Sequence, residues 1–427
     1  MTNGKRVVII GGGFGGLTAA QSMRQTDVVL IDRTNHHLFQ PLLYQVATAA
    51  LSPSDIAWPL RTIFRHSPNV HVVMDEVLVV DRSARLVRLR DGAPISFDAL
   101  VLAPGSRHSY FGHDHWEQWA PGLKTMLDAV RLREMMLMAF EEAERQRMSG
   151  RQRHRLRFII VGGGPTGVEL AGALAEIGRK AMGPDYPSLH LDDLAIVLVE
   201  GGSRILPGFR ADLSAKATRT LERMGVTVRL NSPVTDIRAD GAVIGTEFVP
   251  STNIIWAAGN RAAPLLKSLS APLDGAGRVM VLPDLSIPDD PWIFVIGDAA
   301  HCPGPDGRPL PGLAPVAMQQ GRYVACVIRE GFAPSERKPF VYADRGTLAT
   351  IGRAKAVAQI GRFHLSGLIA WLLWCLVHIF FLIGFRNRIR VMSEWIWYYF
   401  TFKPGARVIF EPLWRSEEHQ TAPAGAP

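Results

Sequence analysis

The stretch Val7-Val8-Ile9-Ile10-Gly11-Gly12-Gly13-Phe14-Gly15-Gly16, followed by Leu17-Thr18-Ala19-Ala20, decides the fold. Its β-branched run predicts a buried strand, and the residues after the glycines favour a helix. In this order of strand, turn and helix, Gly11 allows the tight turn, Gly13 lets the backbone approach a pyrophosphate, and Gly16 lets the helix pack closely on the sheet. The helix N-terminus offers unpaired N–H groups to the phosphates. We therefore predict an α/β unit that binds a dinucleotide.

A second strand, predicted over residues 27–31, ends at an acid. Asp32 stands where a carboxylate can accept hydrogen bonds from both hydroxyls of a ribose. A glycine-rich turn alone is weak evidence, because such turns are common. Strand, turn, helix, strand and acid in register make the assignment specific.

The same pattern returns later in the chain. A strand over residues 157–161 leads into Gly162-Gly163-Gly164-Pro165-Thr166-Gly167 and a helix from Val168, and a strand over residues 195–199 ends at Glu200. The gap from the last glycine to Glu200 exceeds the usual spacing of about 20 residues, so we expect either a lengthened helix or an insertion around residues 182–193. An acid at this strand end repels a 2′-phosphate, so we expect NADH to be preferred over NADPH. A duplicated unit that binds nothing is the alternative.

Composition limits the remaining classes. The 427 residues are enough for two or three domains, and the net charge of +8 comes without the aromatic interleaving of nucleic-acid modules. We therefore expect no nucleic-acid partner and consider an anionic membrane surface the better match. Cys302, Cys326 and Cys375 lie far apart, which argues against a disulfide scaffold, a disulfide relay and a metal site.

Further along, a buried-strand run over residues 292–296 ends in Gly297-Asp298. Here the sequence resembles the two-dinucleotide-binding flavoprotein disulfide reductase superfamily. The resemblance implies an α/β fold of two Rossmann-like domains, in which residues 1–115 and 265–335 form one domain for non-covalent FAD. The NADH domain, residues 116–264, is inserted between them. Leu102–Gly105 and Trp256–Gly259 resemble the crossover segments of the superfamily.

Local motifs indicate one branch of this superfamily. The segments His37–Ala47, Gly167–Gly172 and Ala314–Gly321 resemble those of type II NADH:quinone oxidoreductases, and this resemblance runs from about residue 5 to 405. The quinone-site segment of the family commonly begins Ala-Gln, whereas this chain has Pro315, which lacks both a side-chain amide and a backbone N–H. Quinone recognition must then depend on Gln319, Gln320 or backbone groups. The alternative places the two glutamines as polar helix residues near the pyrimidine edge of the flavin.

The resemblance implies an activity and a set of site residues. NADH gives hydride to FAD, and two electrons then pass to a membrane quinone without proton pumping. We expect Glu169 to assist proton delivery or nicotinamide placement, although an acid near a helix start can also simply stabilise the helix dipole. The FAD contacts we expect are Gly11, Gly13, Phe14, Gly16, Asp32, Arg33, Gln40, Pro41, Ala103, Gly105, Asp298 and Ala317. The NADH contacts we expect are Gly162, Gly164, Thr166, Gly167, Glu200 and Gly259.

The apolar excess of the chain lies near its C-terminus. Residues 365–385 contain no Asp, Glu, Lys or Arg, and as one helix they would reach about 30 Å. A helix-like stretch follows the basic residues Arg386 and Arg388. A helical wheel predicts an amphipathic helix with two opposite sides. Its polar side holds Arg390, Ser393, Glu394 and Thr401, and its apolar side holds Val391, Trp395, Tyr399 and Phe402.

We therefore expect residues 336–415 to anchor the chain as a peripheral, monotopic protein, with helices partly buried against the catalytic body and partly in one leaflet. A transmembrane span is the alternative, and residues 416–427 are expected to be a disordered tail. The N-terminus has no secretory pattern, which places the catalytic body on the cytoplasmic side of the cell membrane. Two rival functions stay open, a reductase of this fold with a soluble protein acceptor and a nucleotide-sensing membrane scaffold. A homodimer, and ubiquinone or menaquinone as acceptor, are also left open.

Overall fold

The computed structural model describes residues 5–150, 156–182, 185–189, 194–305, 307–401 and 406–409. The chain folds into two compact units, each assembled from three separate segments. Unit 1 contains Met1–Leu38, Ala57–Arg107 and Asn260–Arg345. Unit 2 contains Phe39–Ile56, His108–Gly259 and Gly346–Pro427. The expected tail, residues 416–427, lies outside the described residues.

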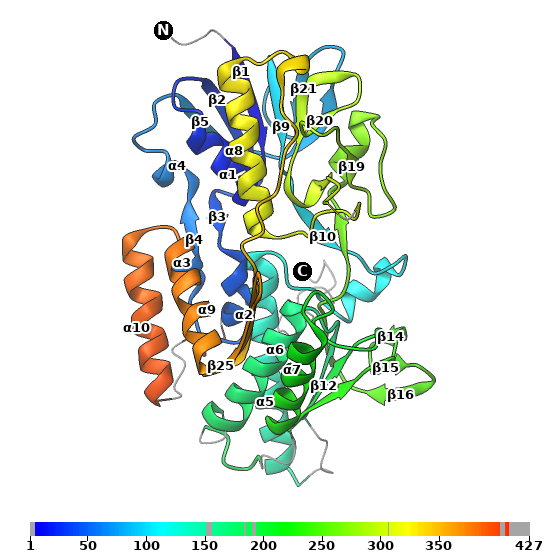
Figure 1. Cartoon of the computed structure of the whole chain (residues 1–427). Helices are drawn as coiled ribbons and strands as arrows, with labels where there is room; N and C mark the ends of the chain where they lie inside the picture. The colour runs from blue at the N-terminus through cyan, green and yellow to red at the C-terminus, as the bar shows by residue number, and fades with distance from the viewer. Residues whose placement is uncertain are drawn as a thin grey trace, which may run out of the picture. The chain divides into compact units, whose positions relative to one another are not determined.

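Six described strands form the central sheet of unit 1, in the order β20-β21-β9-β1-β2-β5 (Figure 1). Strand β20 runs antiparallel to β21, and the other neighbours pair in parallel. Parallel strands covered on both faces carry continuous apolar runs, as β1 and β9 do. The strands are β1 (Arg6–Ile10), β2 (Asp27–Asp32), β5 (Val70–Met74), β9 (Ala99–Leu102), β20 (Ser286–Ile287) and β21 (Asp290–Val295).

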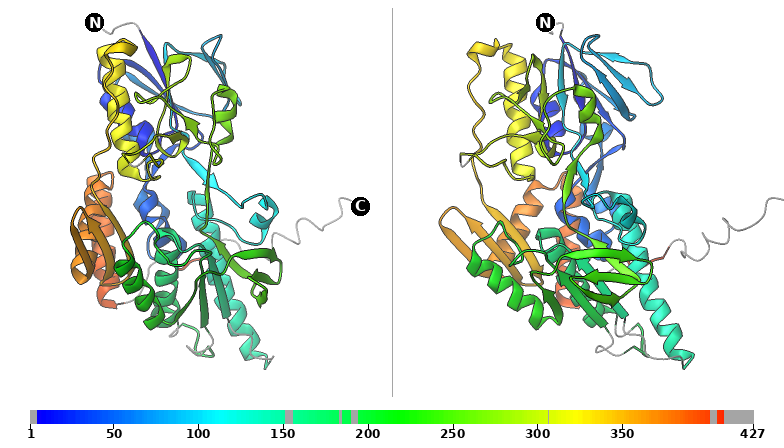
Figure 2. Two further views of the ribbon diagram at one scale, coloured as in Figure 1. Left: turned by 45° about the vertical axis from the view of Figure 1, so that its right-hand side comes forward. Right: turned by 90° about the vertical axis from the view of Figure 1, so that its right-hand side faces the viewer.

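Two different layers cover this sheet. Helices α1 (Phe14–Ser22) and α8 (Ala314–Glu330) lie side by side in Figures 1 and 2. They approach closely at glycine, since a Cβ on Gly321 would lie 2.5 Å from the Gly15 carbonyl oxygen. The other layer is an antiparallel sheet, whose buried valines share one core with the central strands. Its strands are β6 (Val77–Asp81), β7 (Leu86–Leu89) and β8 (Ile95–Ser96).

Unit 2 repeats the plan around a parallel sheet of four described strands, in the order β13-β12-β11-β17. An antiparallel sheet of β14, β15 and β16 packs on one core with these strands. The central strands are β11 (Leu156–Val161), β12 (Leu194–Val199), β13 (Val226–Arg229) and β17 (Asn253–Trp256). The covering elements are α5 (Met126–Met148), α6 (Pro165–Glu176), α7 (Ala211–Arg223), β14 (Val234–Arg238), β15 (Gly241–Ile244) and β16 (Glu247–Pro250).

The C-terminal part of unit 2 begins with an antiparallel sheet that packs against α6 and α7. Figure 2 shows its gold strands beside the green helices. The contact with α6 is tight, because a Cβ on Gly172 would lie only 1.6 Å from the Ile351 carbonyl oxygen. The elements here are β23 (Thr347–Gly352), β24 (Lys355–Ile360), β25 (Phe363–Gly367), α9 (Leu368–Phe381) and α10 (Phe385–Thr401), and the short helices α2 (Leu43–Ala47) and α3 (Pro53–Ile56) lie in the same unit.

Residues 365–385 do not form the single helix that the alternative of a transmembrane span would need. Leu365 to Gly367 complete strand β25, and α9 starts only at Leu368. Gly367 makes the change of direction with φ +78°, a conformation that favours glycine. Helix α9 then ends at Phe381, where Leu382 adopts an extended conformation. Within the described ranges, no helix is both long and apolar enough to cross a membrane.

The helical wheel predicted one polar and one apolar side for α10, but the structure shows an additional apolar stripe on this helix. Val391 is buried and Trp395 and Tyr399 are half-buried, so the apolar side predicted from the sequence faces the protein; Phe402 lies outside the described residues. A further apolar stripe on α10 is exposed, and α9 carries a similar one. The exposed stripes consist of Leu368, Ile369, Leu372, Leu376 and Phe380 on α9, and Phe385, Ile389, Met392, Ile396, Trp397 and Phe400 on α10.

Candidate functional site

The first glycine turn joins β1 to α1 as the sequence predicts. Gly11 has φ +103°, and a Cβ there would lie 2.2 Å from the Ala103 carbonyl oxygen. A Cβ on Gly16 would lie 1.9 Å from the carbonyl oxygen of Gly11, so helix and turn touch through glycine. Gly13 instead has no atom within 4 Å of its Cβ position. The turn therefore leaves open space where a pyrophosphate would meet the helix N-terminus.

Asp32 and His37 complete this turn. Asp32 accepts hydrogen bonds from the Gly12 amide at 2.6 Å and from the Thr34 amide at 2.7 Å. His37 is buried, and its Nδ1 lies 2.9 Å from the Gly12 carbonyl oxygen, to which it must donate. Burial lowers the pKa of His37, so the imidazole is neutral and its Nε2 is an acceptor. Among the described residues Nε2 has no partner, which leaves a buried acceptor free for a bound group.

The remaining residues expected at the FAD site fall into both units. In unit 1, Asp298 accepts a hydrogen bond of 2.6 Å from the Ser106 hydroxyl, and Ala317 lies beside the turn at Gly297, which has φ +69°. Gln40, in unit 2, donates from its side chain to the Lys124 carbonyl oxygen at 3.2 Å. Pro41 also lies in unit 2, while Phe14, Arg33, Ala103 and Gly105 lie in unit 1.

Both candidate quinone-site glutamines use their carboxamides to hold main chain within unit 1. Gln320 is 1% exposed, and its Oε1 accepts the Gly297 amide at 2.7 Å. Gln319 forms a pair of 3.0 Å hydrogen bonds with the amide and carbonyl of Ala343. These bonds fix the loop that carries Asp298 and the stretch of unit 1 that ends at Arg345. In this arrangement the two side chains act as polar supports of the α8 region.

The second glycine turn, in unit 2, reproduces the first. Gly162 has φ +114°, and Gly167 would place a Cβ 1.9 Å from the Gly162 carbonyl oxygen, whereas Gly164 faces open space. Glu200 accepts the amides of Gly163 and Gly202, each at 2.7 Å. Thr166 is exposed, and Gly259 has φ +69° at the end of the strand-to-loop crossover. The turn and its acid thus meet as predicted, despite the long spacing.

Glu169 lies on α6 and is half-buried. Burial raises its pKa to about 8, although hydrogen bonding from the Thr350 amide and the Trp374 side chain opposes this rise. The Thr350 amide nitrogen lies 3.4 Å from Glu169 Oε1. An acid that merely stabilised a helix N-terminus would have a lowered pKa. The pKa of Glu169 is instead raised, because burial favours the protonated carboxyl.

Two family models match the chain. One, pyridine nucleotide-disulphide oxidoreductase, covers residues 5–321, and the other, the NDH2 C-terminal domain, covers residues 345–401. The type II NADH:quinone oxidoreductase Ndh of Mycobacterium tuberculosis is 42% identical over 407 residues, which cover 91% of this chain and 87% of that protein. The chain belongs to the type II NADH:quinone oxidoreductase family.

More distant relatives of this family extend the comparison. A probable NADH dehydrogenase of Dictyostelium discoideum is 28% identical over 92% of this chain and 89% of that protein. The solved structure of NDH2 from Plasmodium falciparum in complex with NADH has a TM-score of 0.86 at 18% identity, covering 95% of this chain and 100% of that chain. The predicted fold class, α/β with two Rossmann-like parts and C-terminal helices, is confirmed.

The residues that surround Glu169 were not predicted from the sequence. Thr350 lies in β23, Trp374 in α9 and Tyr44 in α2, and burial beside Glu169 raises the pKa of Tyr44 well above its usual range. The alternation on either side of Ala354, which has φ +59°, was a signal for the hairpin that carries Thr350. Trp374 lies in the apolar run 365–385, where nothing in the sequence distinguishes it from its apolar neighbours.

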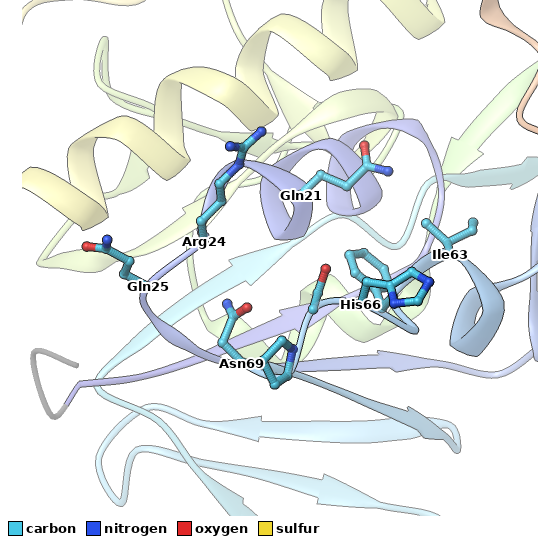
Figure 3. A pocket seen from close by; sticks show the side chains of 9 residues that line it. Gln21, Arg24, Gln25, Ile63, His66 and Asn69 are labelled. Atoms are coloured by element: carbon cyan, nitrogen blue, oxygen red, sulfur yellow. The ribbon is translucent and has the colours of Figure 1, made fainter. Parts of the chain in front are cut away.

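A pocket of about 880 Å³ lies elsewhere on unit 1 (Figure 3). Its lining residues precede strands β2 and β5, so it opens at the amino ends of these strands. In open α/β sheets, ligands bind at the carboxyl ends of strands, where Gly11 and Asp32 lie. The pocket contains none of the predicted site residues. Its lining is Gln21, Arg24, Gln25, Ile63, Phe64, His66, Ser67, Pro68 and Asn69.

Proposed function

We propose that this chain transfers two electrons from NADH to a membrane quinone without pumping protons. The main support is the pair of glycine turns, each of which donates a backbone amide to the acid at the next strand end. The cysteines Cys302, Cys326 and Cys375 are all free, so they do not form a redox-active disulfide. The family of the chain agrees with this activity. A soluble protein acceptor and a scaffold role are not favoured.

The residues of the first turn fit FAD. Gly13 offers the open approach, Asp32 the strand-end carboxylate, and His37 a buried acceptor without a partner in the described part of the chain. When bound, FAD accepts hydride from NADH and passes two electrons to the quinone. Gly11, Gly16 and the other residues expected from the sequence would line this site.

The second turn fits NADH. Gly164 provides the open approach for the pyrophosphate, and Glu200 supplies a carboxylate that favours ribose hydroxyls over a 2′-phosphate. Gly162, Thr166, Gly167 and Gly259 belong to the same proposed site. Comparable catalytic efficiency with NADPH would contradict this assignment.

Glu169 is proposed to hold the proton that the quinone needs. Reduction of a quinone takes up two electrons and two protons; one proton originates in the hydride of NADH, and an acid must supply the other. Burial raises the pKa of Glu169 to about 8, which favours the protonated carboxyl as this acid. Its O–H proton goes to a quinone oxygen, which leaves a carboxylate that solvent later reprotonates. Glu169→Gln keeps the shape and removes this proton transfer. Unchanged steady-state and single-turnover rates in this variant would refute the role.

We further propose that the exposed stripes of α9 and α10 dock on a lipid surface as a peripheral anchor. Contiguous exposed apolar side chains at helical spacing are typical of interfacial helices, and Arg386 stands exposed beside them for anionic headgroups. The proposed location is the cytoplasmic side of the cell membrane. The domain limits 1–115 with 265–335, 116–264 and 336–415 likewise remain our proposal.

One anaerobic titration tests the activity. NADH is added to the holoprotein while flavin absorbance is followed, and a quinone is then supplied. We expect rapid bleaching by NADH and stoichiometric return of the absorbance with quinone. Bleaching without return would indicate another acceptor, and binding without bleaching would indicate a scaffold.

A further inference from the structure

The side chain of Trp374 combines deep burial with an unused donor. It is 2% exposed on helix α9. Within the described ranges, its indole Nε1 makes no hydrogen bond of normal geometry. Buried polar groups are nearly always paired, so an exception calls for a physical reason. The question is which group this N–H serves.

The elements around Trp374 lead to Glu169. Strand β23 packs against both α6 and α9, and the amide of Thr350 on β23 lies 3.4 Å from Glu169 Oε1. The Trp374 indole acts on the same carboxyl, where it and the Thr350 amide both lower the pKa that burial raises. The Thr350 amide therefore lies next to the carboxyl, and the buried Trp374 indole N–H has no other acceptor among the described residues. A neutral carboxyl is a weaker acceptor than a carboxylate.

Neighbouring side chains fix the orientation of the indole. The ring of His378 stacks on Trp374 with centroids 4.1 Å apart, and His378 Nδ1 lies 2.7 Å from the Trp374 carbonyl oxygen. The ring of Trp395 on α10 also packs against the Trp374 ring, with centroids 5.3 Å apart. Its own indole N–H donates to Gln45 at 2.8 Å, and Gln45 donates to the Tyr44 hydroxyl at 2.8 Å. Packing on His378 of α9 and on Trp395 of α10 therefore restricts the rotamer of Trp374, and Gln45 of α2 holds Trp395 in place.

We propose that Trp374 is a positioning residue that, with the Thr350 amide, stabilises the carboxylate of Glu169. The inference rests on the proposed function, in which the Glu169 O–H bond breaks, its proton goes to a quinone oxygen and the electron pair stays on the carboxylate. The two N–H groups then gain a charged acceptor. The Thr350 amide already lies 3.4 Å from the carboxyl and the Trp374 ring is held by packing, so little rearrangement is needed when the charge appears, which lowers the cost of the transfer. The C-terminal helices thus set when Glu169 carries a proton.

Other titratable groups near this carboxyl do not change charge near pH 8. Burial raises the pKa of Tyr44 well above its usual range and that of Cys375 to about 12, and it lowers the pKa of His378 to about 4. All three are therefore neutral there. Further along α6 and its partners lie the charged or titratable groups Glu176, Arg353 and Tyr398, of which Glu176 accepts the Arg353 amide at 2.7 Å.

The test measures the protonation of Glu169 directly in the FAD-loaded protein. Infrared difference spectra over pH give the midpoint of a protonated-carboxyl band, which is assigned by its loss in Glu169→Gln. Trp374→Phe removes the N–H, and replacement of Trp374 by 3-benzothienylalanine does so with nearly the same shape, in case the phenyl ring disturbs folding. We expect either change to raise the midpoint by about one pH unit, since donors to a charged group favour its ionised form.

Trp116→Phe is the matched control. Trp116 is 3% exposed and lies in the core that the β14-β15-β16 sheet shares with the parallel strands of unit 2. Its indole nitrogen also has no partner among the described residues. The titration midpoint of Glu169 in Trp116→Phe should equal that in the unmodified protein. An unshifted midpoint in both Trp374 variants overturns the proposal even if quinone reduction proceeds normally. Failure of the proposed function is distinct, because the unmodified protein would then bleach with NADH and not be reoxidised by quinone.

Discussion

Replacing Gly172 with alanine tests whether α6 and β23 approach as closely as the structure indicates. Gly172 is buried on α6, and its Cβ position lies 1.6 Å from the Ile351 carbonyl oxygen, whereas real Cβ atoms essentially never come within 3.0 Å of such a neighbour. The obstacle is backbone and cannot rotate away. Strand β23 must therefore shift, and the Thr350 amide moves away from Glu169 with it.

Two opposing energies decide the outcome. Alanine in place of glycine stabilises a helix interior by about 1 kcal/mol. Overpacking a well-filled core costs about 1–3 kcal/mol, and a contact as short as this one belongs at the upper end. We expect Gly172→Ala to lower the free energy of unfolding by about 1–2 kcal/mol net. The pKa of Glu169 should rise as well, because one of its two donors is displaced.

Urea denaturation of the FAD-loaded protein measures the first effect, and the infrared midpoint of Glu169 measures the second. Gly208→Ala is the control, since its Cβ position has no atom within 4 Å. The control should change stability by less than about 0.5 kcal/mol. A Gly172→Ala protein more stable than the unmodified one would show that helix propensity acts alone, and the close approach would be refuted.

Three further predictions concern charge and exposure. In the folded protein burial raises the pKa of Glu169 to about 8, from an ordinary value of 4.5, so between these pH values the folded state binds more protons than the unfolded state. The protein should therefore lose stability as pH rises from 4.5 to 8, by up to about 1.4 kcal/mol per pH unit. The urea midpoints of Glu169→Gln should lack this dependence on pH. Glu200→Gln should raise the catalytic efficiency with NADPH relative to NADH, and an unchanged ratio would contradict its role. Changing Leu376 and Phe380 to aspartate should reduce sedimentation with anionic vesicles, while undiminished binding would place the anchor elsewhere.

The glycine turns could be predicted because their physics is local. A strand, a turn that needs φ +103° at Gly11 or φ +114° at Gly162, and an acid at the next strand end are all fixed within a short stretch of chain. Even the meeting of Glu200 with its turn was predicted, although more residues than usual separate the two. The roles of Gln319 and Gln320 could not be predicted, since their main-chain partners, Ala343 and Gly297, become neighbours only in the folded unit.

The C-terminal segment shows a different limit. Hydropathy identifies residues 365–385 as apolar but does not mark the point where β25 ends, which depends on pairing with β24 and on the conformation of Gly367. Partial burial of α10 against the protein body was expected, but the wheel did not separate the covered apolar side from the second apolar stripe that stays exposed. The surroundings of Glu169 come from three elements distant in sequence, and no spacing rule connects Thr350, Trp374 and Tyr44.

The packing of β23 on α6 also bears on how a detergent-free form of this protein can be engineered. Residues from Gly346 onward share a compact unit with the second glycine turn, so cutting them away would uncover the face of α6 that holds Gly172 and Glu169. Shortening the chain would trade one exposed apolar surface for another and remove the donors of a buried acid. Solubility is better improved by replacing the exposed apolar side chains of α9 and α10 with polar ones, one at a time, while the β23–β24 hairpin is left intact.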